Sequence, residues 1–452
     1  QEITIIKVRM SMKGALLKDT SIKSTSMKIT IRSTAILIVA SLLSILLVGC
    51  GGSSSSKDIP KLMTKAQLGE PLFFDKNLSF DRTQSCATCH NPEQGFVDDR
   101  INDASREEIA SAGSLGDNQT SIGDRNAPTA AYAAFSPVFH QGIRSRSNKL
   151  MTDLDIPAYE GFIGGQFWDG READLKGQAG GPPLNPDEMN MPDKASVVER
   201  IKENPEYVAG FEYVYGANIF DDADKAYSAM AESIAEFEKT AEFAPFDSKF
   251  DRSFLAEGDE DRFEYPIAKA GFGKALFFSS DLTCAACHQI MPLPMKRELF
   301  TSFEFHNIGV PENTALREIN GVTTLDNGLL KNEAVSDDSE KGKFKVPTLR
   351  NVAVTAPYMH NGVFNELETV IRFYQHAKDR AADRNTGAVN PETELLWRAA
   401  EISDNIAHDL LGKNKRNLND AEVEGLVCFL MSLTDARYEH LLDPINVQNC
   451  GL

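Results

Sequence analysis

The sequence predicts a mostly α-helical protein that consists of two related domains in tandem. Segments within residues 194–242 and after residue 419 place apolar side chains at helical spacing, whereas the alternating pattern of strands is sparse along the chain. One five-residue motif occurs twice, near residue 86 and near residue 284, and similar residues precede both copies. Because an internal repeat indicates related units, we expect one domain over residues 64–250 and a second over residues 251–452.

The first fifty residues are expected to lie outside the folded protein, as an upstream segment and a signal peptide. Met27 is a plausible start, and two basic residues then precede the apolar run 35–48. Residues 47–50 read Leu-Val-Gly-Cys and resemble a bacterial lipobox, which predicts a periplasmic lipoprotein anchored to the membrane through Cys50 alone. The alternative is a transmembrane anchor, but the run is short for a span of about 20 residues. Residues 51–63 are expected to form a flexible tether.

The charge balance excludes some classes of partner. The chain carries 47 Lys and Arg against 66 Asp and Glu, a net charge of −19. Residues 1–50 hold seven of the basic and two of the acidic side chains, so the remainder carries 40 and 64, a net charge of −24. That balance argues against binding to nucleic acid or to an anionic lipid surface. It suits a basic electron-transfer partner.

The repeated motif predicts two covalently bound c-type haems. Residues 86–90 read Cys-Ala-Thr-Cys-His, and residues 284–288 read Cys-Ala-Ala-Cys-His. C-x-x-C-H is the attachment signature of c-type haem, in which the cysteines form thioethers and the histidine ligates the iron. The adjacent histidine separates this pattern from a zinc site or a redox C-x-x-C pair. The expected haem-binding residues are Cys86, Cys89, His90, Cys284, Cys287 and His288.

The residues that precede each haem motif, and the C-terminal region, predict further helices and a loop. Both copies of the motif follow a Leu-Phe-Phe segment, at 72–74 and 276–278, which we expect to pack an apolar helix face against the porphyrin edge. A helix is expected to begin near Asn419, and residues 308–342 are expected to form a loop because they are rich in Gly, Asn and Asp.

Seven cysteines divide between three uses. One is Cys50, and four belong to the haem motifs. Cys428 and Cys450 remain. In an oxidising periplasm they can pair as a disulfide, or they can stay as two separate thiols, one of them in a helix. The sequence leaves both alternatives open.

From about residue 64 to residue 436 the chain resembles the bacterial diheme cytochrome c peroxidases and their MauG-like relatives. The resemblance implies two cytochrome c-like haem domains. It also implies that the N-terminal haem reacts with hydrogen peroxide, while the C-terminal haem passes electrons or stores oxidising equivalents. The motifs that carry it, in order, are 72–75 (Leu-Phe-Phe-Asp), 85–90 (Ser followed by the first haem motif), 126–129 (Asn-Ala-Pro-Thr), 167–171 (Phe-Trp-Asp-Gly-Arg), 188–189 (Glu-Met), 284–288 (the second haem motif), 347–351 (Pro-Thr-Leu-Arg-Asn) and 357–360 (Pro-Tyr-Met-His).

The resemblance also implies three catalytic residues. Glu188 matches the family's distal glutamate, the acid/base that moves a proton between the peroxide oxygens, and burial beside a haem should raise its pKa. Gln178 matches the distal glutamine that positions the peroxide. Trp168 matches a tryptophan that lies between the haems and relays electrons or holes. Without the surrounding motifs, Glu188 would be a solvated surface charge and Trp168 a core residue.

The chain departs from the main peroxidase pattern near the first haem. Those enzymes carry a histidine shortly before Asn-Ala-Pro-Thr, which caps the peroxidatic iron at rest. Here residues 123–125 read Gly-Asp-Arg, so we expect the His90 haem to be five-coordinate or water-bound and ready without reductive activation. His140, on a segment that looks inserted between residues 129 and 167, is either an alternative cap or an ordinary loop histidine.

A second departure concerns the other haem. The peroxidases supply a methionine ligand fourteen residues beyond the histidine of Pro-Tyr-x-His, and counting from His360 reaches Tyr374. MauG-like proteins place an axial tyrosine there. A phenolate stabilises ferric and ferryl iron, so it lowers the haem potential relative to a Met ligand. Met359 is the competing ligand, and a core tyrosine is the other alternative.

The resemblance further implies one calcium ion between the haems. Asn126, Thr355 and Pro357 match the family's calcium site, in which backbone carbonyls supply part of the oxygen set, as a hard cation requires.

The leading functional expectation is a diheme c-type cytochrome peroxidase. It would reduce hydrogen peroxide at the N-terminal haem with electrons from a small cytochrome c or cupredoxin, relayed through the C-terminal haem. One alternative is a MauG-like oxidase that uses a high-valent diheme state to oxidise residues of a partner protein. The other is a non-enzymatic electron carrier, which would have two six-coordinate irons and no use for Glu188. Dimers are common in the family, and the sequence leaves a homodimer open.

Overall fold

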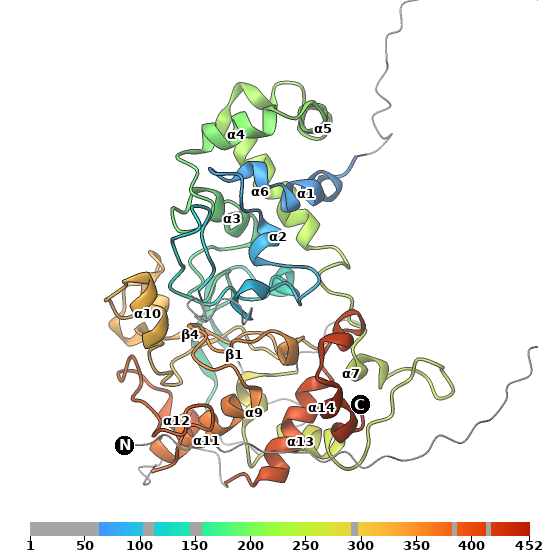
Figure 1. Cartoon of the computed structure of the whole chain (residues 1–452), viewed down its shortest axis with the longest axis vertical. Coiled ribbons are helices and arrows are strands. Elements are labelled where there is room, and N and C mark those ends of the chain that lie inside the picture. Colours follow the sequence, from blue (N-terminus) through green and yellow to red (C-terminus); the bar gives the residue numbers. More distant parts are fainter. Residues whose placement is uncertain (1–62, 103–112, 145–155, 291–296, 382–386, 413–416) are drawn as a thin grey trace, which may run out of the picture. The chain divides into compact units, whose positions relative to one another are not determined.

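The computed structural model describes residues 63–102, 113–144, 156–290, 297–381, 387–412 and 417–452. This part of the chain is mostly helical with two short two-stranded sheets, so the predicted fold class is confirmed (Figure 1). The expected signal peptide with Cys50, and the tether up to residue 62, lie outside the described residues. Within the described ranges, no helix combines the length and the apolar character that crossing a membrane requires.

The N-terminal half holds the helices predicted from residues 194–242. The first helix begins at Thr64, whose side chain accepts a hydrogen bond from the backbone of Gln67 while the Gln67 side chain accepts one from Thr64. The α-helices of this half are α1 Lys65–Phe74, α2 Cys86–Cys89, α3 Leu175–Ala179, α4 Lys194–Lys202, α5 Pro205–Tyr215 and α6 Ala223–Glu238.

The C-terminal half is also built mainly from α-helices. The helix expected near Asn419 is confirmed, and it starts with a reciprocal pair of hydrogen bonds between Asn419 and Glu422. The α-helices of this half are α7 Lys249–Arg252, α8 Ala270–Phe277, α9 Cys284–Cys287, α10 Thr314–Asn320, α11 Leu367–Ala381, α12 His408–Leu411, α13 Asp420–Met431 and α14 Pro444–Cys450.

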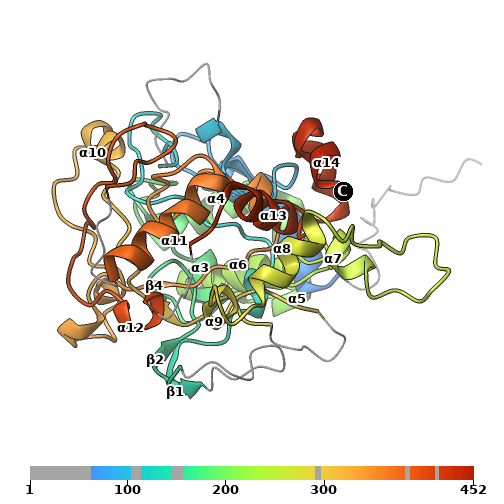
Figure 2. The ribbon, with the colours of Figure 1, turned by 90° about the horizontal axis from the view of Figure 1, so that it is seen from below.

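The internal repeat has a structural counterpart in two helix crossings. Helix α1 packs on α6 at Gly69, where an added Cβ would collide with the Ser233 backbone. Helix α8 packs on α13 at Gly273, where a Cβ would collide with the Gly425 carbonyl, and Figure 2 shows these two helices side by side. In each half, therefore, the helix before a haem motif crosses a later helix at a glycine that lets the backbones approach closely.

The expected loop over residues 308–342 is wrong in one part, because it contains α10. The Asn313 side chain accepts a hydrogen bond from the Leu316 N–H and caps the start of this helix. Gly321, at φ +69°, ends it. Both are ordinary helix-boundary residues, but seven residues between them are too few to show a clear helical period.

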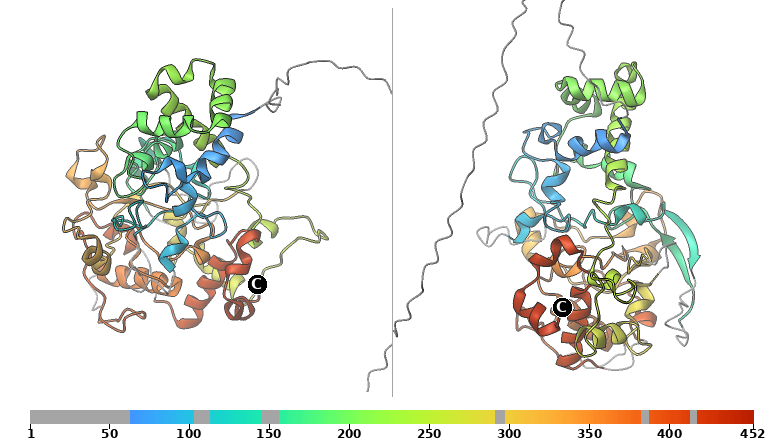
Figure 3. Two further views of the ribbon diagram at one scale, coloured as in Figure 1. Left: turned by 45° about the horizontal axis from the view of Figure 1, so that its top comes forward. Right: turned by 90° about the vertical axis from the view of Figure 1, so that its right-hand side faces the viewer.

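The described residues also form two short antiparallel strand pairs. Strand β1 His140–Arg144 pairs with β2 Tyr159–Ile163, and β3 Phe305–His306 pairs with β4 Phe344–Lys345. A bridge between Ile163 and Glu304 joins the two pairs. The β1–β2 hairpin, drawn in teal in the right-hand view of Figure 3, occupies the segment that the sequence marked as an insertion.

Two large hydrophobic cores fill the described part of the chain. The first gathers residues 68–246 together with Leu299 and Phe303, and the second begins at Phe250. Because two residues from the C-terminal side pack into the first core, the boundary between residues 250 and 251 stays a prediction.

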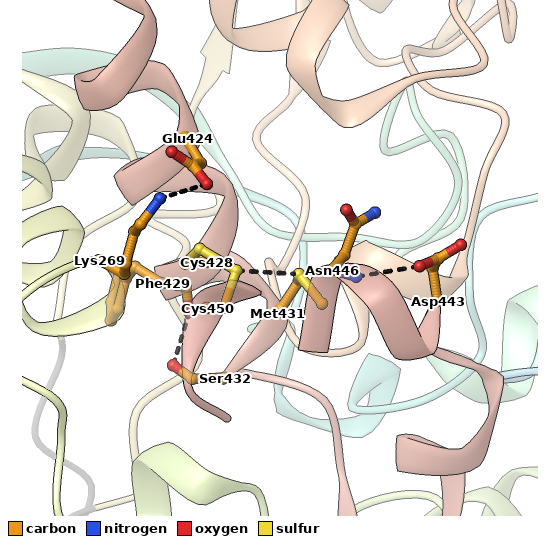
Figure 4. The surroundings of a disulfide bond; sticks show 9 residues. All are labelled: Lys269, Glu424, Cys428, Phe429, Met431, Ser432, Asp443, Asn446 and Cys450. Carbon is orange, nitrogen blue, oxygen red and sulfur yellow. Dashed lines mark hydrogen bonds and ion pairs between the residues drawn. A yellow bond between two sulfur atoms is a disulfide. The ribbon is translucent and has the colours of Figure 1, made fainter. Parts of the chain in front are cut away.

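A disulfide joins the last two helices. Cys428 in α13 bonds to Cys450 in α14, so the alternative of two separate thiols is wrong (Figure 4). The pair lies in a small third cluster of buried side chains, where the Cys450 Sγ is 3.8 Å from the Met431 Sδ. An ion pair between Lys269 and Glu424 holds the start of α8 against α13 nearby (Figure 4).

Candidate active site

The first haem motif is arranged to present a neutral imidazole. Cys86 and Cys89 form the single turn of α2 and are free thiols, and His90 follows at its end. The His90 Nδ1 lies 3.2 Å from the Phe96 carbonyl oxygen. A hydrogen bond donated there fixes the tautomer and leaves Nε2 free for iron. Burial lowers the pKa of His90, which favours this neutral, metal-binding form.

The second motif repeats that geometry. Cys284 and Cys287 are free thiols in α9, and the His288 Nδ1 lies 2.9 Å from the Phe300 carbonyl oxygen. Burial lowers the pKa of His288 to about 4. Each histidine is therefore oriented by a carbonyl that lies beyond the motif itself, and both motifs have the donors that a c-type haem needs.

A large, mostly apolar cavity adjoins the second motif. Its walls bring together the haem-attachment residues of α9, Phe277 from the Leu-Phe-Phe lead-in and leucines of α13, which suits the flat apolar surface of a porphyrin. Tyr374 and Met359 both line this cavity, so both candidate axial ligands are in place. Burial raises the pKa of Tyr374 well above its usual range. A phenolate here therefore needs the charge of a bound ferric iron.

Glu188 lies within electrostatic range of the first motif. Burial is the largest cause of the raised pKa values of the Cys86 and Cys89 thiols, and the charge of Glu188 makes a smaller contribution in the same direction. Burial in turn raises the pKa of Glu188, and this outweighs the opposing effects of Arg171 and of the Asn185 amide, which donates a 2.9 Å hydrogen bond to the carboxylate. The group is thus held in its protonated form to a higher pH than a surface glutamate.

Gln178 and Trp168 occupy different parts of the structure. Gln178 lies in α3, which packs on α6 in the first half of the chain, and within the described ranges no hydrogen bond joins it to Glu188. Trp168 lines the cavity at the second motif and also a second, smaller cavity beside it. Its Nε1–H donates to the Asn126 carbonyl at 2.8 Å, and its own carbonyl accepts from the Lys345 N–H at 2.8 Å.

The smaller cavity brings together the three residues matched to a calcium site. Asn126, Thr355 and Pro357 all line it, and the Asn126 amide donates to the Pro357 carbonyl at 2.7 Å. A half-turn of that amide would direct its oxygen to the same place. Among the described residues, no group of three His, Cys, Asp or Glu side chains is arranged to hold a metal. A cation there would therefore rest on neutral oxygens.

Sequence reasoning missed two polar residues at these cavities. Lys345 lines both of them, and burial lowers its pKa to about 7. His360 lines the larger one, stacks on Phe344 with ring centroids 3.6 Å apart, and has an Nε2 without a hydrogen-bond partner in the described part of the chain. His360 lies in one of the motifs that identified the family and Lys345 lies just before another, but nothing in the sequence distinguished these positions as cavity walls.

The segment that lacks the capping histidine is held by ion pairs, of which those of Arg125 are buried. Arg125 donates to Asp326 at 2.6 and 2.7 Å and to Asp169 at 2.6 Å, while Asp124 pairs with Lys331 at 2.9 Å. Burial alone would raise the pKa of Asp326, but the hydrogen bonds and charge of Arg125 hold it well below its usual range. Arg125 is thus committed to two carboxylates that neighbour Trp168 and the larger cavity.

His140 is placed as an ordinary loop histidine. It lies exposed on β1, and its Nδ1 is 2.8 Å from the carbonyl of Val138, two residues away. The residues that line the two cavities do not include it. The structure favours this alternative over a cap on the first haem.

Comparisons with known proteins agree with this geometry. A family model described as di-haem cytochrome c peroxidase matches residues 63–261. The chain is 44% identical over 381 residues to the methylamine utilization protein MauG of Paracoccus denitrificans, covering 84% of this chain and 90% of that protein. It is 33% identical over 330 residues to the cytochrome c peroxidase Ccp of Escherichia coli, covering 71% and 56% of the two chains.

Among solved structures, a diheme peroxidase also has a similar fold. The diheme peroxidase BthA of Burkholderia thailandensis superposes with a TM-score of 0.67 at 27% identity, over 84% of this chain and 88% of that one. The expectation of an enzyme is confirmed, and with it that of two c-type haems. This chain belongs to the di-haem cytochrome c peroxidase family.

Proposed function

We propose that this enzyme uses hydrogen peroxide to withdraw electrons from a partner protein, oxidising residues of that partner in the manner of the MauG-like branch. The observation that carries the proposal is Tyr374, which lines the cavity of the second haem motif where the peroxidase pattern has methionine. The 44% identity to MauG over most of both chains supports it. We therefore place the MauG-like oxidase ahead of the cytochrome c peroxidase, whereas the sequence alone led us to expect the opposite order.

The bound haems would supply the iron chemistry that cleaves peroxide and holds two oxidising equivalents. The chain's own residues supply the rest. Glu188 takes a proton from one peroxide oxygen and returns it to the leaving oxygen, and its raised pKa suits that exchange. Gln178 positions the peroxide through its amide. Trp168 would relay electrons or holes between the haems, and it lines the cavity of the second haem motif. The overall balance is H₂O₂ + 2 H⁺ + 2 e⁻ → 2 H₂O, with both electrons drawn from the partner.

A peroxidase that takes electrons from a small cytochrome c or cupredoxin is the second candidate, favoured by the 33% identity to the Escherichia coli enzyme. A turnover assay separates the two. Holoenzyme is given peroxide with reduced cytochrome c, with a cupredoxin, with candidate partner proteins, or with no donor. We expect mass spectrometry to find oxidised side chains on a partner protein. Rapid turnover with a small carrier, and no modified partner, would establish the peroxidase instead.

Two further assignments belong to this proposal. Asn126, Thr355 and Pro357 are the residues that would hold one calcium ion, because they line a single cavity beside Trp168. The enzyme would act in the periplasm, lipid-anchored through Cys50, since the Cys428–Cys450 disulfide suits an oxidising compartment. Metal analysis of holoenzyme before and after chelation tests the first. Incorporation of labelled palmitate into the full chain, but not into a Cys50→Ala variant, tests the second.

A further inference from the structure

The chain has one other tryptophan, Trp397, and it connects the second core to the surface. Its indole is partly buried against that core. The Phe373 ring lies 5.9 Å from it, centroid to centroid, and the His376 ring stacks on it at 5.4 Å with an interplanar angle of 16°. Phe373 also contacts Tyr374 at 6.1 Å. Ring contacts therefore run without a gap from the cavity of the second haem motif to Trp397.

The surface beside Trp397 is apolar. Val389, Leu395 and Leu396 are 50%, 68% and 65% exposed. An antiparallel bridge pairs Val389 with Leu396, and the Asn390 N–H donates to the Leu395 carbonyl at 2.8 Å. The turn is thus held in a defined shape that keeps three large side chains in water. Clustered exposure of this kind marks an interaction site rather than chance. We call these three residues the Leu395 patch.

The charges around the Leu395 patch are mostly acidic. Glu394 is exposed in the same turn, and Glu392 accepts hydrogen bonds from the backbone N–H groups of Asn365 and Glu366, which brings the exposed Glu366 alongside. The neighbouring Arg398 donates to Thr314 on α10 at 2.7 Å. An apolar centre with an acidic rim is complementary to a protein that has an apolar centre and a basic rim.

We propose that Trp397 is the residue through which electrons enter this enzyme, and that the Leu395 patch is where a basic electron-donating protein docks. The proposal rests on the proposed function, which supplies hydrogen peroxide as the oxidant. Trp397 loses one electron toward Tyr374 and regains one from the docked partner. Two such transfers, with two protons, reduce one H₂O₂ to two waters and leave the partner oxidised by two electrons. The Phe373 ring packs between the Tyr374 and Trp397 rings. The electron passes between those two rings, and Phe373 itself is not oxidised.

The relay is tested with Trp397→Phe and Trp397→Tyr holoenzymes in stopped flow, using reduced basic cytochrome c as the probe. We expect Trp397→Phe to slow cytochrome c oxidation by about tenfold or more, while the single-turnover reaction with peroxide, measured without donor, keeps the wild-type rate. Trp397→Tyr, which restores a redox-active ring, should recover most of the rate. A second readout needs no donor: EPR after peroxide addition should show a tryptophan radical that Trp397→Phe weakens and that ring deuteration of tryptophan alters.

The docking surface is tested with a matched pair of variants. Leu395→Lys adds a positive charge to the patch, and Ile445→Lys adds the same charge on α14 at a residue that is 67% exposed. Calorimetric titration with ferric cytochrome c should give a Kd that rises about tenfold for the first variant and little for the second. Equal changes would show that net charge alone is responsible, and would overturn the patch.

The outcomes distinguish this inference from the function beneath it. If wild-type holoenzyme consumes no peroxide, the proposed function fails and the relay fails with it. If wild-type and Trp397→Phe enzymes consume peroxide and oxidise cytochrome c at equal rates, and the radical signal is the same in both, only the relay is wrong.

Discussion

At the scale of single residues, burial decides what the site can do. Glu188 has a raised pKa because the cost of burying its charge exceeds the help that Arg171 and Asn185 give to the carboxylate. The haem histidines respond to the same cost in the opposite direction, since burial keeps them neutral. A carboxyl whose pKa is raised toward neutrality can take and return a proton, and a neutral imidazole can ligate iron, as peroxide cleavage at a haem requires.

Glu188→Gln should slow the reaction with peroxide by a factor on the order of 10²–10⁴, because the amide cannot exchange a proton. Stopped-flow mixing of holoenzyme with peroxide measures this rate. The matched control is Asp187→Asn, a neighbouring exposed carboxylate, which should react at the wild-type rate. A wild-type rate in Glu188→Gln would remove this residue from the mechanism.

Tyr374→Phe should change the absorption and EPR spectra of the second haem, because it removes the phenolate that we expect on the iron. Met359→Leu is the control, since Met359 lines the same cavity and is the competing ligand. The opposite result, with an altered spectrum in Met359→Leu and none in Tyr374→Phe, would assign the methionine as ligand.

The sequence identified individual site residues only where known family motifs lay beside them. Tyr374 was identified by its spacing from a family motif and Asn126 by its place within one, and the structure puts both at cavities. Lys345 and His360 were overlooked because their importance lies in burial against a shared cavity, which a linear pattern does not record. Trp397 is one of two tryptophans in the sequence, and no motif assigned it a role.

At the scale of elements, glycines set how closely the helices approach. The sequence repeat showed that two lead-in helices are related, but it did not show what each would cross, since α6 and α13 begin more than a hundred residues after their partners. The disulfide between α13 and α14 was open because the positions of two cysteines in the sequence do not show whether their side chains meet. Helix α10 was missed because it is short.

Gly273→Ala should destabilise the fold by about 1–3 kcal/mol or more, because the new methyl group would meet the Gly425 carbonyl and the backbones cannot separate without loosening the core. Chemical denaturation of holoenzyme measures the free energy of unfolding. Gly180→Ala is the matched control, as its Cβ would make only ordinary contacts from 3.5 Å. Equal stability of the two variants would contradict the close crossing of α8 and α13.

Arg125→Ala should cost about 3–5 kcal/mol of unfolding free energy, because it removes the buried cation shared by the carboxylates of Asp169 and Asp326 and leaves them only the more exposed Arg171 and Lys331. Arg82→Ala breaks an exposed pair with Glu203 and should cost no more than about 1 kcal/mol. Thermal unfolding of both variants gives the comparison. Similar losses would mean that the buried ion pairs do not hold the segment at residues 124–126.

At the scale of the whole molecule, two equivalent haem motifs lead to unequal sites. Both histidines are oriented by a backbone carbonyl and both follow a glycine-crossed helix. The difference lies in what faces them. Tyr374 and Met359 offer a further ligand at the second motif, whereas the segment with Asp124 and Arg125 is held by ion pairs, of which that of Arg125 with Asp326 is buried. We therefore expect peroxide chemistry at the first haem and electron exchange with a partner at the second.

The EPR spectrum of the as-isolated diferric holoenzyme tests that asymmetry most directly. We expect one high-spin haem, five-coordinate or water-bound, and one low-spin six-coordinate haem. We also expect peroxide to change the spectrum without prior reduction. Two low-spin six-coordinate haems that do not react with peroxide would contradict this asymmetry.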